Sequence, residues 1–223
     1  MQAVRPPLAA LEVALPGSPV PPGRRQPGGP APGSRGLAGT SMVGPGCVGV
    51  LAARIVHIGL RGAAHVLQAD AACVSLGAGN RGIDYEWGDS GWAAGETVNA
   101  VAVLGGRAIA SLRVSQADPR ERHRGISHHS LTAYGRVAMA PADLPVPLLS
   151  GDFGERVLQQ ARGLVRDSAG RLSLREVETG GLVEALASSP VALCTMGRGL
   201  DQDEASFVAA AAAGRFAATL LGP

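Results

Sequence analysis

The chain shows its fold class most clearly at residues 93–114, which read AAGETVNAVAVLGGRAIASLRV. Residues 93–104 are rich in Ala and Val and predict a helix. The glycine pair after them would end it, because glycine readily adopts the left-handed backbone of a helix C-cap. In residues 107–114 apolar side chains recur at every second position, which is the period of a strand with one buried face. The stretch therefore predicts a helix followed directly by a strand.

Similar patterns alternate along the rest of the chain. Helical patterns occur in residues 50–67, 127–140, 153–165, 182–187 and 201–221, and strand patterns occur in residues 72–76, 172–177 and 191–195. We interpret residues 141–150 as a linker and expect Asp152 to cap the helix that follows. Such alternation favours an α/β fold with a mostly parallel sheet flanked by helices.

The composition limits the chemistry that the chain can perform. All 20 basic residues are arginines, so a Schiff-base lysine, a pyridoxal-phosphate anchor and a P-loop lysine are excluded. Aromatic residues make up 3% of the chain and hydrophobic residues 46%, so the core must consist of Ala, Val and Leu. A net charge of +2 is too small to indicate nucleic-acid binding, and we do not expect any.

The N-terminal residues differ in composition from the rest. Ten of the 16 prolines lie at or before Pro45, and residues 22–33 consist mainly of Pro and Gly, which oppose both helix and sheet. We therefore expect a disordered Pro/Gly-rich tail over residues 1–41 and a single α/β domain over residues 42–223.

Neither a membrane nor an oxidising compartment is indicated. No run of about 18 apolar residues is present, so we expect no transmembrane helix, no membrane association and a cytoplasmic protein. The three cysteines, Cys47, Cys73 and Cys194, form no CxxC pair. Apolar runs surround Cys73 and Cys194 and predict buried thiols.

Three polar or glycine-rich loops each follow a predicted strand. They span residues 77–80, 115–129 and 196–200. Because the carboxyl ends of parallel strands share one edge of a sheet, where ligands bind, we expect the three loops to form one site. The first and third loops would contribute the ligand-binding residues Gly77, Gly79, Asn80 and Arg198.

The second loop is the richest in chemical groups, and its residues 118–130 read DPRERHRGISHHS. Ser127 predicts the N-cap of the next helix, whose first turn would carry His128 and His129. Free N–H groups and the dipole at a helix start favour an anion, and arginine suits bidentate recognition of phosphate or carboxylate. We therefore expect a small anionic ligand to be bound by the arginines of this loop, Arg120, Arg122 and Arg124.

The same loop contains the candidate catalytic groups. An imidazole with a pKa near neutrality suits proton transfer, so we expect any catalysis to depend on His123, His128, His129 and Asp118. The sequence does not choose between a reaction and binding alone, and no cofactor can be assigned.

Other interpretations of the loop remain open. A metal ion could be held by His123 and Asp118 with His128 or His129, but adjacent helix histidines point about 100° apart and seldom bind one ion together, so we assign no metal ligand. Arg–Asp pairs could instead hold the loop closed, as a structural or protein-contact element without catalysis. RNA binding through arginines and an aromatic cluster is the weakest alternative; that cluster comprises Tyr85, Trp87 and Trp92.

This loop also carries a resemblance to a known family. The run ADPRERHRGISHHSLT at residues 117–132, together with residues 99–106 and 195–199, resembles the bacterial proteins grouped as domain of unknown function 3866. The resemblance covers roughly residues 50–222. It implies an α/β fold and a bacterial cytoplasmic protein, and it brings no assigned reaction and no established catalytic residues.

The chain departs from that family in two places. The family's glycine-rich loop usually reads Gly-Pro-Gly and then a Gly-Thr-Gly-Thr-like stretch, whereas residues 77–84 read GAGNRGID and lack the threonine hydroxyls. The family also has a longer N-terminal portion, which residues 1–40 do not resemble. We therefore expect this chain to lack the usual N-terminal portion, which would leave the site incomplete.

Overall fold

The computed structural model describes residues 10–15, 38–43, 51–53, 55–76, 87 and 90–221. The chain divides into two compact units, Met1–Ser90 and Gly91–Pro223, and each is described by itself. Both units contain strands paired in parallel together with helices, so the expected α/β class is confirmed. Among the described residues, no helix combines the length and apolar character needed to cross a membrane.

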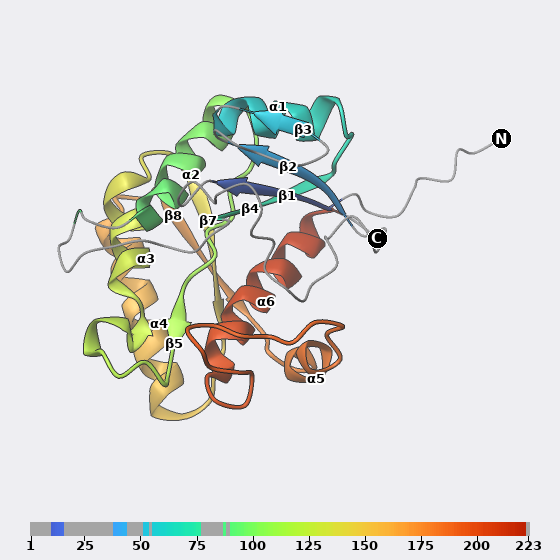
Figure 1. The fold of residues 1–223 in the computed structure, drawn as a ribbon. Helices are drawn as coiled ribbons and strands as arrows, with labels where there is room; N and C mark the ends of the chain where they lie inside the picture. Colours follow the sequence, from blue (N-terminus) through green and yellow to red (C-terminus); the bar gives the residue numbers. More distant parts are fainter. Residues whose placement is uncertain are drawn as a thin grey trace. The chain divides into compact units, whose positions relative to one another are not determined.

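The first unit is built on a four-stranded parallel sheet (Figure 1). Its strands lie in the order β3 (Leu51–Ala53), β2 (Ala38–Val43), β1 (Ala10–Leu15) and β4 (Ala71–Leu76). Helix α1 (Val56–His65) lies between β3 and β4 in the chain and packs against β1, β2 and β3. The strand predicted over residues 72–76 is confirmed, and the helical pattern of residues 50–67 contains α1 with β3 before it.

Two strands of this sheet lie in or beside the expected N-terminal tail. β1 lies within residues 1–41, and β2 crosses the expected boundary at residue 42, with Ala10 opposite Ala38 and Ala14 opposite Met42. Many of the prolines and glycines that predict disorder fall between the two strands, in residues 16–37, which lie outside the described residues. The organisation into a tail and one domain stays a prediction.

The second unit is organised around strands β7 (Ala142–Pro147) and β8 (Leu172–Val177). A short 3-10 turn, η2 (Ser90–Trp92), begins at the last residue of the first unit. The other elements are, in chain order, α2 (Ala93–Val103), β5 (Val114–Ser115), η3 (Glu121–His123), β6 (Gly125–Ile126), α3 (His128–Thr132), the π-helical turn η4 (Ala133–Val137), α4 (Gly151–Asp167), α5 (Leu182–Ala187) and α6 (Glu204–Leu220).

The predicted helix over residues 93–104 and its glycine stop are confirmed. Gly105 has a φ of 75°, and its N–H donates to the carbonyl of Ala102 at 3.0 Å. The N–H of Gly106 donates to the carbonyl of Val101 at 2.9 Å. These two bonds form a Schellman motif, which satisfies the last carbonyls of α2. The elements predicted over residues 172–177 and 182–187 are confirmed as β8 and α5.

Strand β7 is the centre of the second unit, so the prediction of a linker over residues 141–150 is wrong. β7 pairs in parallel with β8, and all its residues are buried. Helices α4 and α6 both pack against the two strands, which lie between them in Figure 1. Two prolines within six residues argue against a central strand, and for that reason the sequence pattern indicated a linker.

The direction of the backbone N–H groups explains how β7 accommodates these prolines. The N–H of Asp143 donates to the carbonyl of Ala108, on the side away from β8. Because N–H groups alternate along a strand, Pro145 and Pro147 remove donors from that same side only. The ladder with β8 stays intact, while pairing with residues 107–114 ends early.

The strand predicted over residues 107–114 is accordingly formed only in part. Its alternation is confirmed, because the side chains expected on one face are buried, namely Ala108, Ala110, Leu112 and Val114. Its pairing is limited to an isolated bridge between Ile109 and Asp143 and to the two residues of β5, which pair with β6.

The strand predicted over residues 191–195 is wrong. These residues form a loop in which Val191 is 48% exposed and Thr195 makes only an isolated bridge to Arg198. Cys194 in this loop and Cys73 in β4 are both exposed, so the prediction of buried thiols is also wrong. A short apolar run does not reveal whether a partner strand is available, and here none pairs with it among the described residues.

Three helices begin or end at other residues than the sequence predicted. The pattern over residues 127–140 begins as expected after Ser127, but it becomes the π-helical turn η4 and ends at Val137. Helix α4 has Ser150 as its N-cap, so Asp152 lies in the first turn and is not the cap. The final helix begins after Asp203, slightly later than expected.

Helix α2 and the turn η4 pack closely at Gly95. A Cβ added there would meet the carbonyl oxygen of Ala133 and would lie 2.9 Å from the Cβ of Val137. Replacing Gly95 with alanine should therefore lower the free energy of unfolding by about 1–3 kcal/mol, because the added methyl group overpacks this contact. Urea unfolding followed by circular dichroism measures the change.

The matched control for this prediction is Gly214→Ala in α6. An added Cβ meets no atom within 4 Å at that position, so alanine should raise stability by about 0.5–1 kcal/mol through its higher helix propensity. Equal effects of the two substitutions would contradict the packing argument.

Asp143 of β7 links its strand to two neighbouring segments. Its carboxylate accepts hydrogen bonds from the Nε of Arg107 at 2.6 Å and the Nε of Arg175 at 2.7 Å, and its side chain is 6% exposed. Burial by itself raises the pKa of Asp143, but the two guanidinium groups outweigh burial and hold the pKa below its usual value.

The folded protein should therefore lose stability in acid through Asp143. Because the pKa of Asp143 is lower in the folded chain, its carboxylate stabilises the fold above the unfolded pKa of about 3.9. That contribution disappears as the pH falls through the folded-state pKa. The difference in unfolding free energy between the wild type and Asp143→Asn should be largest near neutral pH and shrink below about pH 4.

Urea unfolding at a series of pH values measures this difference. Asp167→Asn, which alters an exposed carboxylate at the end of α4, serves as the control and should change stability little at any pH. A difference for Asp143→Asn that stays constant into acid would show that the ion pairs do not contribute as described.

Candidate functional site

One buried carboxylate organises the polar loop between β5 and α3. Asp118 is 1% exposed, and its two oxygens accept hydrogen bonds from the Nε and Nη2 of Arg120, each at 2.9 Å. The backbone N–H of Arg120 also donates to the carboxylate, at 3.1 Å. The Arg120 guanidinium holds the pKa of Asp118 far below its usual range, so the carboxylate is ionised at neutral pH.

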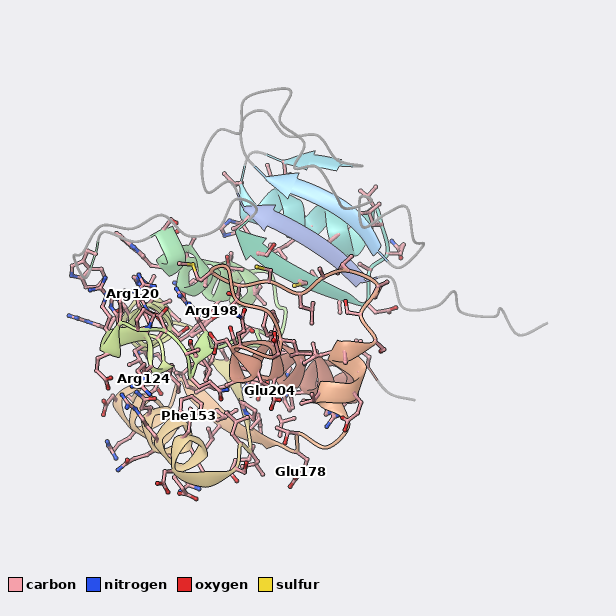
Figure 2. All side chains as sticks on the ribbon, turned by 60° about the horizontal axis from the view of Figure 1, so that its bottom comes forward. Arg120, Arg124, Phe153, Glu178, Arg198 and Glu204 are labelled. Carbon is pink, nitrogen blue, oxygen red and sulfur yellow. The ribbon has the colours of Figure 1, made fainter. Side chains whose placement is uncertain are left out.

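Two further arginines converge on the same carboxylate. The Nη2 of Arg113 lies 3.4 Å and the Nη2 of Arg198 lies 3.7 Å from Oδ2 of Asp118. Figure 2 labels Arg120 and Arg198, which reach this carboxylate from separate loops. The second and third of the predicted loops therefore meet at Asp118.

Asp203, buried just before α6, extends this network. Its Oδ2 accepts hydrogen bonds from Ser115 Oγ at 2.6 Å and from Arg198 Nε at 3.0 Å. Its Oδ1 accepts from the N–H of Gln116 at 3.0 Å. Ser115 Oγ in turn accepts from the N–H of Asp118 at 3.0 Å, so the two buried carboxylates share one hydrogen-bond network.

The sequence reasoning missed three members of this network. Asp203 could have been found as an acidic residue directly before an apolar helix, where a helix start is expected. Arg113 lies on the polar side of an alternating pattern, which marks exposure and gives no partner. Ser115 carries no signal in the sequence that distinguishes it from other loop serines.

Three imidazoles gather in the same loop. The ring centroid of His123 lies 5.0 Å from that of His128 and 5.1 Å from that of His129, and the last two lie 4.0 Å apart. One ring nitrogen from each histidine lies within 4.8 Å of the others. His123 is buried at 1% exposure, whereas His128 and His129 are partly exposed. The structure thus brings the three predicted histidines together.

The ring nitrogens of His123 have unequal surroundings. Nδ1 lies 2.8 Å from Ser127 Oγ, while Nε2 is buried and has no hydrogen-bond partner among the described residues. An unsatisfied buried nitrogen costs about 1–3 kcal/mol. Burial first, and then the positive charges of Arg113 and Arg120, lower the pKa of His123 to about 4, so the ring is neutral at pH 7.

Ser127 is the N-cap of α3, as expected, and its Oγ accepts the N–H of His129 at 3.4 Å. The helix has only five residues before the π-helical turn η4. So short a helix has little dipole, and the dipole part of the argument for an anion at this position is weakened. The argument from the arginines is unaffected.

The structure describes some of the other predicted ligand residues, and the rest lie outside the described residues. Arg122 and Arg124 are exposed on the loop, and Figure 2 labels Arg124. Glu121, which lies between Arg120 and Arg122 in the chain, forms an ion pair with Arg156 of α4. Gly77, Gly79, Asn80 and Tyr85 lie outside the described residues, so the convergence of the first loop with the other two stays a prediction.

The Asp118 network makes a testable contribution to stability. Asp118→Asn should lower the free energy of unfolding by about 2–3 kcal/mol, because a neutral amide cannot replace charge-assisted hydrogen bonds to Arg120 in a buried position. Asp167→Asn, at an exposed ion pair with Arg166, should change it by less than about 0.5 kcal/mol. Similar losses in the two variants, measured by urea unfolding at neutral pH, would contradict a structural role for Asp118.

The comparisons with known proteins give a family and no relatives of known activity. The family model described as "Protein of unknown function (DUF3866)" matches residues 34–214. No curated protein and no solved structure matches the chain. The resemblance seen in residues 117–132 is therefore confirmed, while the bacterial origin and the missing N-terminal portion stay predictions. Since the match extends over most of its length, the chain belongs to the DUF3866 family of proteins of unknown function.

Proposed function

We propose that the second unit binds a small anionic metabolite, carrying a phosphate or carboxylate group, at the surface formed by residues 113–130 and Arg198. The observation that best supports this is the surplus of guanidinium groups. Residues 113–124 and 196–200 contain five arginines and two acidic residues, Asp118 and Glu121, and Asp203, which pairs with Arg198, adds a third carboxylate. A positive surplus around a partly buried loop attracts anions.

The arginines would have two roles, fixing the loop and contacting the anion. Arg113, Arg120 and Arg198 are held by Asp118, so they fix the loop and supply a positive field. Arg122 and Arg124 are exposed and would contact the anion directly. Their guanidinium groups suit the paired oxygens of phosphate or carboxylate.

The histidines would act at the edge of the bound anion. His128 and His129 are partly exposed, so they are the imidazoles that can exchange a proton with a ligand. His123 is neutral and buried, and it cannot serve as a proton donor at neutral pH. The predicted proton-transfer role of Asp118 receives little support, because its carboxylate is ionised and bound to arginine.

A second candidate is a non-catalytic element in which the loop has a structural or protein-contact role. The convergence of three arginines on Asp118 favours this reading, since such pairs hold a loop closed without any ligand. The two candidates differ in one measurable property: only the first predicts that anions stabilise the fold.

Thermal unfolding of the full chain with inorganic phosphate, nucleotides or sugar phosphates tests the proposal. An anion present at 100 times its Kd stabilises the native state by about 2.7 kcal/mol, which corresponds to a rise in Tm of about 5–10 °C. The double variant Arg122→Gln/Arg124→Gln should keep its fold, because both side chains are exposed. It should lose most of the rise in Tm, because these two side chains are proposed to contact the anion.

The controls separate binding from general salt effects. Phosphate stabilises many proteins by exclusion from their surface, so chloride at matched ionic strength and the variant Arg166→Gln are measured in parallel. Arg166 is an exposed arginine of α4 whose loss should leave the rise unchanged. If no anion raises the Tm of the wild type above that of the double variant, the structural candidate is favoured.

A further inference from the structure

The His123, His128 and His129 cluster has the dimensions of a metal site. Bonds of about 2.0–2.1 Å from zinc to imidazole nitrogen place two ligand nitrogens about 3.3 Å apart in a tetrahedral site. The three nitrogens here lie within 4.8 Å of one another, so the rings need to close by at most about 1.5 Å. Rotation of the partly exposed His128 and His129 side chains can supply that movement.

The sequence-based objection to this cluster does not hold for the geometry found. Adjacent histidines of a helix diverge by about 100° around its axis. His128 and His129, at the very start of a five-residue helix, nevertheless have ring centroids only 4.0 Å apart. His123 reaches them from the turn η3, so the third ring does not depend on helical spacing.

A separate observation at His123 indicates a ligand. His123 belongs to the cluster and is 1% exposed, and its Nε2 has no hydrogen-bond partner among the described residues. Its Nδ1 lies 2.8 Å from Ser127 Oγ. If Nδ1–H donates to that oxygen, Nε2 carries a lone pair directed away from Ser127. A hydrogen bond from the second ring nitrogen is what orients a metal-binding histidine.

Ion pairs with a carboxylate reduce the repulsion that the nearest guanidinium groups would exert on a cation at the cluster. Arg113 and Arg120, the guanidinium groups that affect His123 most, are already paired with the buried carboxylate of Asp118. Asp118 itself is bound by Arg120 through both oxygens and is not available as a ligand.

From this geometry we infer that His123, His128 and His129 bind a divalent transition-metal ion, with zinc as the ion of best fit. Imidazole nitrogens suit zinc, copper and nickel, and a set without carboxylates does not suit magnesium or calcium. Three protein ligands leave a fourth position for water, as in sites where zinc activates water. The inference goes beyond the proposed anion binding and does not depend on it, because the metal is titrated without any anion.

The test uses the full chain without a histidine tag, since a tag would bind the same ions. After treatment with a chelator and dialysis, Zn²⁺, Co²⁺, Ni²⁺ and Mn²⁺ are titrated separately by isothermal calorimetry. We expect one Zn²⁺ per chain, an increase in Tm on binding, and visible absorption bands of tetrahedral Co²⁺.

Substitutions then locate the ion. His129→Ala and His128→Ala should each weaken Zn²⁺ binding at least about tenfold and remove the Co²⁺ bands. The matched control is His65→Ala, an exposed histidine of α1, which should leave binding unchanged. His123→Ala should abolish binding; if circular dichroism shows that it does not fold, the two partly exposed positions decide the question.

Exposed thiols provide a second route to zinc binding that must be separated. Cys73 and Cys194 are exposed, so the titration is repeated with Cys73→Ser/Cys194→Ser, where one Zn²⁺ per chain should persist. The inference is overturned if the wild type binds none of the four ions, if binding is lost in the cysteine variant, or if it survives unchanged in His128→Ala and His129→Ala. The anion experiment fails or succeeds separately, because it depends on Arg122 and Arg124.

Discussion

The structure of the polar loop depends on the burial of the Asp118 carboxylate. A carboxylate removed from water must be paired and hydrogen-bonded, and Asp118 meets this requirement with arginines from three places in the chain. Because the chain contains no lysine, every such partner is a planar guanidinium with a fixed set of donors. The loop therefore has few alternative conformations that would keep Asp118 satisfied.

The same constraint connects the loop to the core of the second unit. Ser115 lies at the end of β5 and bonds to both Asp118 and Asp203, and Asp203 directly precedes α6. Helix α6 packs against β7, the fully buried strand. Hydrogen bonds thus connect the buried Asp118 carboxylate to the start of α6, which packs against the central strand. A loop anchored in this way can hold side chains such as His123 in a fixed position.

The sequence predicted the features that depend on local patterns. Residues 93–106 form the expected helix and glycine stop because both depend on near neighbours in the chain. β7 was missed because its suitability as a strand depends on which side of the ladder Pro145 and Pro147 face, and that side is set by a distant partner. The strand predicted over residues 191–195 was wrong for the opposite reason. Its apolar residues suit a strand, but no partner strand pairs with them among the described residues.

The sequence could predict which residues form the candidate site, but it could not predict which of them pair with one another. The dense segment at residues 118–130 identified Asp118, Arg120 and the three histidines, but the roles within it follow from long-range contacts. A loop that only had to stay closed would need the Asp118 ion pairs and nothing more. The buried Nε2 of His123 has no hydrogen-bond partner in the described part of the chain, a cost of about 1–3 kcal/mol that an apolar side chain would avoid. An imidazole in that position, with two others beside it, is understandable if the nitrogen has a ligand to bind.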